Sequence, residues 1–183
     1  MAEKEKELQR GLLVVYTGNG KGKTTAALGM CVRAVGHNWN ICLIQFIKGS
    51  WKYGELEGLK RLAPNVELHV VGEGCVGILG DTKSFEEHRK AAKEGISLAI
   101  EKVESGRYQL IILDELNVAM KLGLVTEAEA KSILDVRNKA QHLVITGRDA
   151  PDWLKEMADL VTEMREIKHP YRKGILARKG IDW

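Results

Sequence analysis

Two short stretches carry the residues that could bind and activate a phosphate compound. The first reads Gly-Asn-Gly-Lys-Gly-Lys-Thr-Thr. Its glycines let consecutive backbone N–H groups surround phosphate oxygens, because no Cβ stands in the way. Lys23 can reach the outer phosphates, and the hydroxyl of Thr24 is placed to hold Mg²⁺. We therefore predict a phosphate-binding P-loop, whose binding residues are Gly18, Asn19, Gly20, Lys21, Gly22, Lys23, Thr24 and Thr25.

This loop departs from the pattern G-x-x-x-x-G-K-[ST] at its first position, where Thr17 stands in place of glycine. Gly18 follows directly and partly compensates for the change. The alternative interpretation is a glycine-rich turn that binds nothing. We favour the P-loop, because Lys21 and Lys23 place two positive charges in the loop with no acidic neighbour beside them in the sequence.

The second stretch is Asp114-Glu115, which directly follows the apolar run Leu110–Leu113. Next to a P-loop, carboxylates at the tip of a buried strand hold Mg²⁺ directly or through water. The alternative is that the two residues only favour the N-terminus of a following helix. The P-loop favours the metal interpretation, and the predicted ligands of Mg²⁺ or Mn²⁺ are Thr24, Asp114 and Glu115.

The elements that must position these residues alternate along the chain. We expect strands at 12–17, 41–46, 66–71, 110–113 and 141–146, and a half-covered edge strand at 160–167. We expect helices at 23–35, 53–62, 84–105 and 126–138, and a short one that has Pro151 in its first turn. This order predicts a single-domain α/β fold, P-loop NTPase-like and RecA-type, with a mostly parallel sheet and helices on both faces. Residues 1–10 are expected to form a solvated N-terminal arm, and residues 11–183 the domain.

Further polar residues follow the predicted strands. Ligands bind at the carboxyl ends of the strands in open α/β sheets, which places Gln45, Lys48 and Arg148 on the binding side. Arg148 is a candidate phosphate or transition-state contact, although a surface ion pair stays open for it and a solvated side chain for Lys48. The loop Gly72–Asp81 contains four glycines in ten residues and is a candidate substrate lid.

Composition narrows the class of protein. The chain has 183 residues, 44% of them hydrophobic and 29% charged, as in water-soluble globular proteins. Its net charge of +3 gives no support for nucleic-acid binding, so a DNA motor is the least supported class. The three cysteines form no C-x-x-C pair, which argues against a zinc site or a disulfide framework. No signal peptide or membrane span is recognisable, so we expect a cytoplasmic protein without membrane contact.

Several blocks of the sequence closely resemble the ATP:cob(I)alamin (corrinoid) adenosyltransferases. They occur in that family's order and cover nearly the whole chain. The blocks are residues 17–27, Arg33-Ala34-Val35-Gly36-His37, Gln45-Phe46-Ile47-Lys48-Gly49, Leu113-Asp114-Glu115-Leu116, Ile145-Thr146-Gly147-Arg148 and Gly180-Ile181-Asp182-Trp183.

The resemblance implies that the Co(I) centre of a reduced corrinoid attacks the 5′ carbon of ATP, which lies reversed in the P-loop, and that tripolyphosphate leaves. Because Co(I) is itself a strong nucleophile, the protein needs no base. Catalysis then rests on alignment and on neutralising the leaving group, with Lys21, Lys23 and Glu115 as the catalytic residues. The resemblance further implies that Arg33 contacts the nucleoside end of ATP, that a flavoprotein supplies the reductant, and that the protein is a homodimer.

One loop departs from the family pattern. In the best-known branch, an aromatic pair in this loop packs under the corrin and displaces its lower ligand. Cys75 and Gly77 stand at those places here, so either the loop handles the corrinoid differently or Phe85 or Trp51 takes over this role. An incidental cysteine is the favoured interpretation of Cys75 over a cobalt ligand.

Two other functions stay open. An ordinary P-loop ATPase or kinase would need a residue that positions water or an acceptor, for which Glu115 is the candidate. A nucleotide-dependent corrinoid carrier would bind ATP tightly without turnover.

Overall fold

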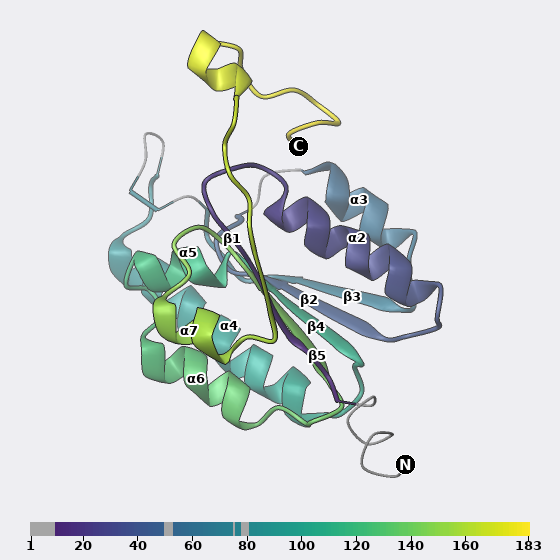
Figure 1. The fold of residues 1–183 in the computed structure, drawn as a ribbon. Helices are drawn as coiled ribbons and strands as arrows, with labels where there is room; N and C mark the ends of the chain where they lie inside the picture. The colour runs from purple at the N-terminus through teal and green to yellow at the C-terminus, as the bar shows by residue number, and fades with distance from the viewer. Residues whose placement is uncertain (1–9, 50–52, 75, 78–80) are drawn as a thin grey trace.

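The computed structural model describes residues 10–49, 53–74, 76–77 and 81–183. Its described strands form one sheet in which every pairing is parallel, in the order β3-β2-β4-β5-β1-β6 (Figure 1). The strands are β1 Leu13–Thr17, β2 Ile41–Gln45, β3 Val66–Val70, β4 Leu110–Asp114, β5 His142–Thr146 and β6 Leu160–Glu163. The helices are α2 Lys23–Val35, α3 Gly54–Lys60, α4 Phe85–Glu104, α5 Leu116–Lys121, α6 Glu127–Asp135 and α7 Asp152–Met157, followed by a 3₁₀ turn, η1 Pro170–Lys173.

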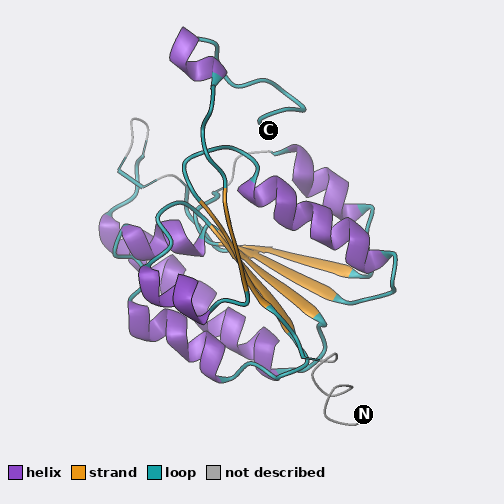
Figure 2. Ribbon diagram, in the orientation of Figure 1, coloured by secondary structure: helices purple, strands orange, loops and turns teal. Residues whose placement is uncertain are grey.

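Helices cover both faces of the sheet, with α2 and α3 on one side and α4 to α7 on the other (Figure 2). Side chains alternate along each strand, so each face has its own core. On β4, Leu110 and Ile112 pack toward α2, whereas Ile111 and Leu113 pack toward α4. The central strands are buried on both faces, which explains their nearly continuous apolar sequences. The predicted parallel α/β sheet is confirmed.

The strand order places the two chemical stretches near each other. The P-loop leaves the carboxyl end of β1, and Asp114 ends β4. Strand β5 lies between them and ends in Thr146. All three strand ends meet at the same edge of the sheet because the strands are parallel.

Three expectations are wrong. Helix α6 ends at Asp135, not near Asn138, and beyond that end the guanidinium of Arg137 donates to the carbonyl oxygens of Gly11 and Gln141. Pro151 is the N-cap residue of α7 and lies just outside the first turn.

The third correction concerns β6, which was expected to have one covered face. All four of its residues are exposed, with Leu160 at 43% and Val161 at 41%. The strand has a single neighbour, β1, and the short helix α7 packs on β1. An alternating pattern cannot show whether a helix is available to cover the strand.

Within the described part of the chain, none of the helices combines the length and apolar character that crossing a bilayer requires.

Candidate nucleotide-binding site

The P-loop lies between β1 and α2 and is packed against the segment that follows β6. Gly18 has a φ of +94°, and a Cβ on it would lie 2.4 Å from the carbonyl oxygen of Met164. A Cβ on Gly20 would lie 2.7 Å from the carbonyl carbon of Arg165, and the Gly20 N–H donates to the Met164 oxygen at 2.7 Å. Close packing against the segment after β6 therefore requires glycine at both positions.

Lys23 is buried, with 7% of its surface exposed, and its side chain folds back over the loop. Its ammonium group donates to the carbonyl oxygens of Gly18 at 2.7 Å and Gly20 at 2.8 Å. Burial lowers the pKa of Lys23, and the nearby carboxylate of Glu115 opposes this shift. The amine is thus held at the start of α2, where the helix dipole also favours an anion.

Asp114 is fully buried and organises the ends of four elements. Its Oδ1 accepts hydrogen bonds from the hydroxyls of Thr24 at 2.8 Å and Thr146 at 2.7 Å. Its Oδ2 accepts one from the amide of Gln45 at 3.1 Å and lies 3.8 Å from the Lys48 ammonium. Because a hydroxyl that donates keeps two lone pairs, Thr24 is aligned by Asp114 and can still bind a cation.

Glu115 directly follows Asp114 but extends into the cavity described below. Its backbone is left-handed, with a φ of +62°, and its N–H donates to the Thr146 hydroxyl at 3.0 Å. Burial raises the pKa of Glu115, and the neighbouring Asp114 charge raises it further. The described residues contain no group of three or more His, Cys, Asp and Glu side chains placed to hold a metal. A magnesium ion would need phosphate or water oxygens in addition to Thr24 and Glu115, which is the usual arrangement for this ion.

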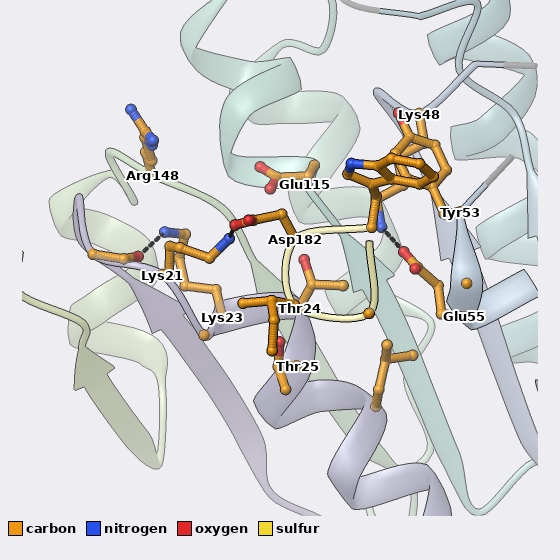
Figure 3. A pocket seen from close by; sticks show the side chains of 17 residues that line it. Lys21, Lys23, Thr24, Thr25, Lys48, Tyr53, Glu55, Glu115, Arg148 and Asp182 are labelled. Atoms are coloured by element: carbon orange, nitrogen blue, oxygen red, sulfur yellow. Dashed lines mark hydrogen bonds and ion pairs between the residues drawn. The ribbon is translucent and has the colours of Figure 1, made fainter. Parts of the chain in front are cut away.

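A cavity of about 620 Å³ opens beside these groups (Figure 3). One part is lined by polar and charged residues, namely Lys21, Lys23, Thr24, Glu115 and Arg148. The rest of the lining includes Leu28, Lys48, Tyr53, Gly54, Glu55, Ile181, Asp182 and Trp183.

Ion pairs at the cavity join segments that are distant in sequence. Lys21 pairs with Asp182, which lies far from it in the sequence. Lys48 pairs with Glu55 and lies 4.8 Å from the centre of the Tyr53 ring. The positions of Asp182, Tyr53 and Glu55 at the cavity were not predicted, because no local sequence pattern connects these residues to the P-loop.

The structure does not bring all predicted site residues to the cavity. Lys21, Lys23, Thr24, Thr25 and Arg148 line it, together with Gly20, Gly22 and Glu115. Gly18 and Asn19 belong to the loop but do not line the cavity.

Arg33 also lies outside this lining. It is in the last turn of α2, about 15 Å along the helix axis from Lys23. Its contact with the nucleoside end of ATP stays a prediction.

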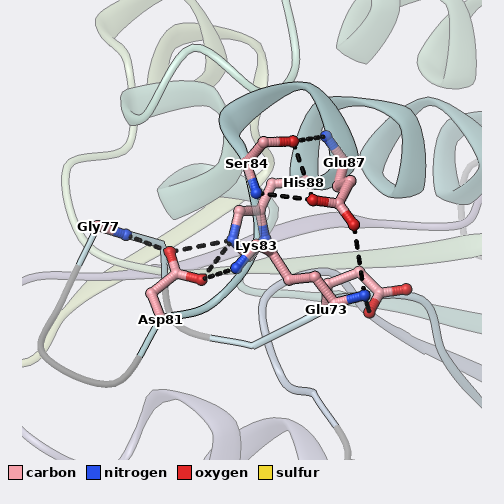
Figure 4. Close-up of polar contacts among 7 residues, drawn as sticks. All are labelled: Glu73, Gly77, Asp81, Lys83, Ser84, Glu87 and His88. Atoms are coloured by element: carbon pink, nitrogen blue, oxygen red, sulfur yellow. Dashed lines mark hydrogen bonds and ion pairs between the residues drawn. The ribbon is translucent and has the colours of Figure 1, made fainter.

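The end of the predicted lid is fixed by Asp81 (Figure 4). Its two oxygens accept hydrogen bonds from the N–H groups of Gly77 at 2.7 Å and Lys83 at 3.0 Å, and both lie 3.1 Å from His88 Nε2. The pKa of Asp81 is lowered to about 2, above all by the hydrogen bond from the Gly77 N–H, and then by those from the Lys83 N–H and the His88 side chain. His88 is only 3% exposed, so the loop is attached to the buried side of α4.

Several expectations for the lid fall outside the described residues. They concern Cys75 and Trp51. Residues 1–9 of the predicted N-terminal arm also lie outside the described residues. Gly77 is described and has a φ of +69°, and Phe85 is 49% exposed in the first turn of α4.

Comparisons with known proteins give relatives for nearly the whole chain. The family described as ATP:corrinoid adenosyltransferase BtuR/CobO/CobP matches residues 9–183. A corrinoid adenosyltransferase from Pseudomonas aeruginosa is 37% identical over 175 residues, which cover 96% of this chain and 85% of the relative. One from Escherichia coli K12 is also 37% identical, over 96% of this chain and 87% of the relative.

A solved structure, the flagellar accessory protein FlaH from Methanocaldococcus jannaschii, shares the fold. Its TM-score is 0.54 at 10% identity, over 84% of this chain and 71% of FlaH. The sequence relatives, which extend over almost the whole chain, identify the family. The chain belongs to the ATP:corrinoid adenosyltransferases, enzymes that adenosylate corrinoids.

Proposed function

We propose that this chain transfers the 5′-deoxyadenosyl group of ATP to the Co(I) centre of a reduced corrinoid, in the formation or salvage of adenosylcobalamin. A cobalt–carbon bond forms as the bond between the 5′ carbon and its oxygen breaks, and that oxygen leaves with the electron pair as tripolyphosphate. The observation that carries this proposal is the concentration of cations beside Glu115 in the cavity, which suits an anionic leaving group.

The chain's own residues act on the phosphate end. Lys23 is held over the P-loop and Arg148 lines the same part of the cavity, so both are placed to neutralise charge that develops on the leaving group. Lys21 adds a third cation. No histidine lines the cavity among the described residues, which fits a nucleophile that needs no base.

The donor set also suits Mg²⁺, or Mn²⁺ in its place. Thr24 and Glu115 would hold the ion together with phosphate oxygens, and Asp114 would act through the Thr24 hydroxyl or a water. When bound, the ion supplies positive charge to the phosphate oxygens.

The test is an anaerobic assay with purified protein, ATP, Mg²⁺ and chemically reduced cob(I)alamin. We expect a light-sensitive adenosyl-corrinoid and tripolyphosphate in equal amounts. The corrinoid spectrum measures the adenosyl-corrinoid, and identification of the phosphate product measures the tripolyphosphate. Omitting the reductant is the matched control, because the same protein and ATP are then present without Co(I).

Two outcomes would contradict the proposal. Orthophosphate release without corrinoid would indicate an ATPase, and ATP binding with neither product would indicate a carrier. The flavoprotein reductant, the homodimer and the cytoplasmic location stay predictions.

A further inference from the structure

The last residues of the chain, Arg178–Trp183, form a compact turn, which we call the C-terminal turn. The N–H of Arg178 donates to Asp182 Oδ2 at 2.7 Å, and the Asp182 N–H donates back to the Arg178 oxygen at 2.8 Å. The N–H of Gly180, whose φ is +78°, donates to the Trp183 oxygen at 2.7 Å. These internal bonds give the turn a defined shape outside the sheet.

The C-terminal turn is attached to the P-loop at one point and to α3 at another. The other oxygen of Asp182, Oδ1, pairs with the ammonium group of Lys21, as Figure 3 shows. A Cβ on Gly54, at the start of α3, would lie 3.7 Å from the carbonyl carbon of Trp183, so the two backbones lie close together. The turn therefore closes one end of the cavity.

This end differs chemically from the phosphate end. Its lining is mostly apolar, with Leu28, Tyr53, Ile181 and Trp183, although the ion pair of Lys48 and Glu55 lies beside Tyr53. Trp183 keeps 46% of its surface exposed. The polar end offers Lys23, Arg148 and the start of α2 to an anion. A ligand that fills the whole cavity must join a polyanion to a flat apolar group. The volume of the cavity, about 620 Å³, is typical of small-molecule sites.

We infer that this apolar end binds the adenine base of ATP, and that Trp183 provides the surface on which the base stacks. Aromatic side chains bind bases by stacking, which needs little hydrogen bonding to the base edge. Asp182 is a positioning residue that holds the C-terminal turn in place through Lys21. An ammonium group has three donors, so Lys21 can bind Asp182 and a phosphate oxygen together. The inference rests on the proposed function only in taking ATP as the nucleotide.

The test compares two ligands that share the phosphate chain but not the base. ATP and inorganic tripolyphosphate are titrated with Mg²⁺ in a calorimeter, without corrinoid, against the wild-type protein, Trp183→Ala and Trp183→Phe. We expect Trp183→Ala to weaken ATP binding about tenfold and to leave tripolyphosphate binding within twofold. Trp183→Phe keeps an aromatic face and should lose no more than about threefold for ATP. Ile167→Ala is the matched control, because Ile167 is 91% exposed in the same C-terminal segment and does not line the cavity.

Three results would overturn the inference. Equal weakening of both ligands would mean that the turn supports the phosphate end. Unchanged or tighter ATP binding in Trp183→Ala would mean that the turn does not contact the base or blocks the site. An equal loss in the Phe and Ala variants would exclude stacking.

A failure of this inference is separable from a failure of the proposed function. The titrations contain no corrinoid, so a protein that discriminates ATP from tripolyphosphate through Trp183 but forms no adenosyl-corrinoid would contradict only the proposed function. Normal adenosyl transfer by Trp183→Ala with unchanged ATP affinity would contradict only the inference.

Discussion

Asp114 and Asp81 are both carboxylates that accept several hydrogen bonds, but they hold very different parts of the molecule. Asp114 is fully buried at the end of a central strand, and its partners come from α2, β2 and β5. Asp81 lies on a loop, and its partners lie within seven residues of it. The phosphate end is therefore assembled by three strands and a helix, whereas the end of the predicted lid is fixed by a local cluster.

This difference predicts how each region responds to mutation. Changes at the phosphate end should affect turnover and global stability, because several elements meet there. Changes at the lid should affect one substrate only and leave the fold unchanged.

The largest effect is expected from Lys23→Ala. The substitution removes a buried cation from the P-loop, and we expect turnover to fall by at least about 1,000-fold, because positioned charges contribute strongly to transition-state stabilisation. Lys60→Ala, on exposed α3, is the control and should keep wild-type turnover. The initial rate of adenosyl-corrinoid formation measures both. A loss of turnover below tenfold would show that the loop amides and the metal suffice to stabilise the leaving group without Lys23.

The second effect is on stability. Asp114→Asn directs an amide N–H₂ toward groups that now donate to the carboxylate, so we expect the free energy of unfolding to fall by about 2 kcal/mol. Urea denaturation measures the change. Asp152→Asn is the matched control, since the Asp152 side chain is 88% exposed and should have little effect. Equal stability of the two variants would contradict the view that Asp114 joins the strand ends.

A smaller effect is expected from Asp81→Asn, on the premise that the lid contacts the corrinoid. The amide cannot accept from Gly77, Lys83 and His88 together, so we expect the KM for corrinoid to rise about fivefold. ATP affinity should stay unchanged. Steady-state kinetics with each substrate varied in turn separates the two. Glu73→Gln is the control in the same loop, because the carboxylate of Glu73 makes only a long contact, at 3.7 Å, with the Lys83 ammonium. A weaker ATP affinity in Asp81→Asn would contradict the view that the loop affects corrinoid binding alone.

The smallest effect is a local response to pH. The pKa of Asp81 is about 2 in the fold, against an ordinary value of 3.8, so its ionised form stabilises the loop fully above that ordinary value. The stabilisation is lost as the pH falls from about 4 toward 2. We expect faster amide hydrogen exchange at Gly77 and Lys83 over this window, after correction for the intrinsic rate. Asp81→Asn should show no such step, and a step of equal size in that variant would assign the titration to another group.

The features that could be predicted from the sequence are the local ones, and those that could not be predicted depend on contacts between distant residues. The glycine-rich loop between β1 and α2 and the strand that ends in Asp114 are local patterns, and both occur as expected. The predicted parallel sheet follows from the alternation of strands and helices. The pairing of Lys21 with Asp182 joins residues 161 positions apart, which no local pattern encodes. The exposure of β6 likewise depends on what packs beside it and not on its own sequence.

The left-handed backbone of Glu115 has a practical consequence. A residue with a Cβ pays about 1 kcal/mol or more in this conformation, and glycine does not. Glu115→Gly would therefore relieve strain in the fold while removing the carboxylate from the cavity. Such a protein, with Lys23 and Asp114 in place, would separate what the Glu115 carboxylate contributes to the site from what its backbone costs the fold.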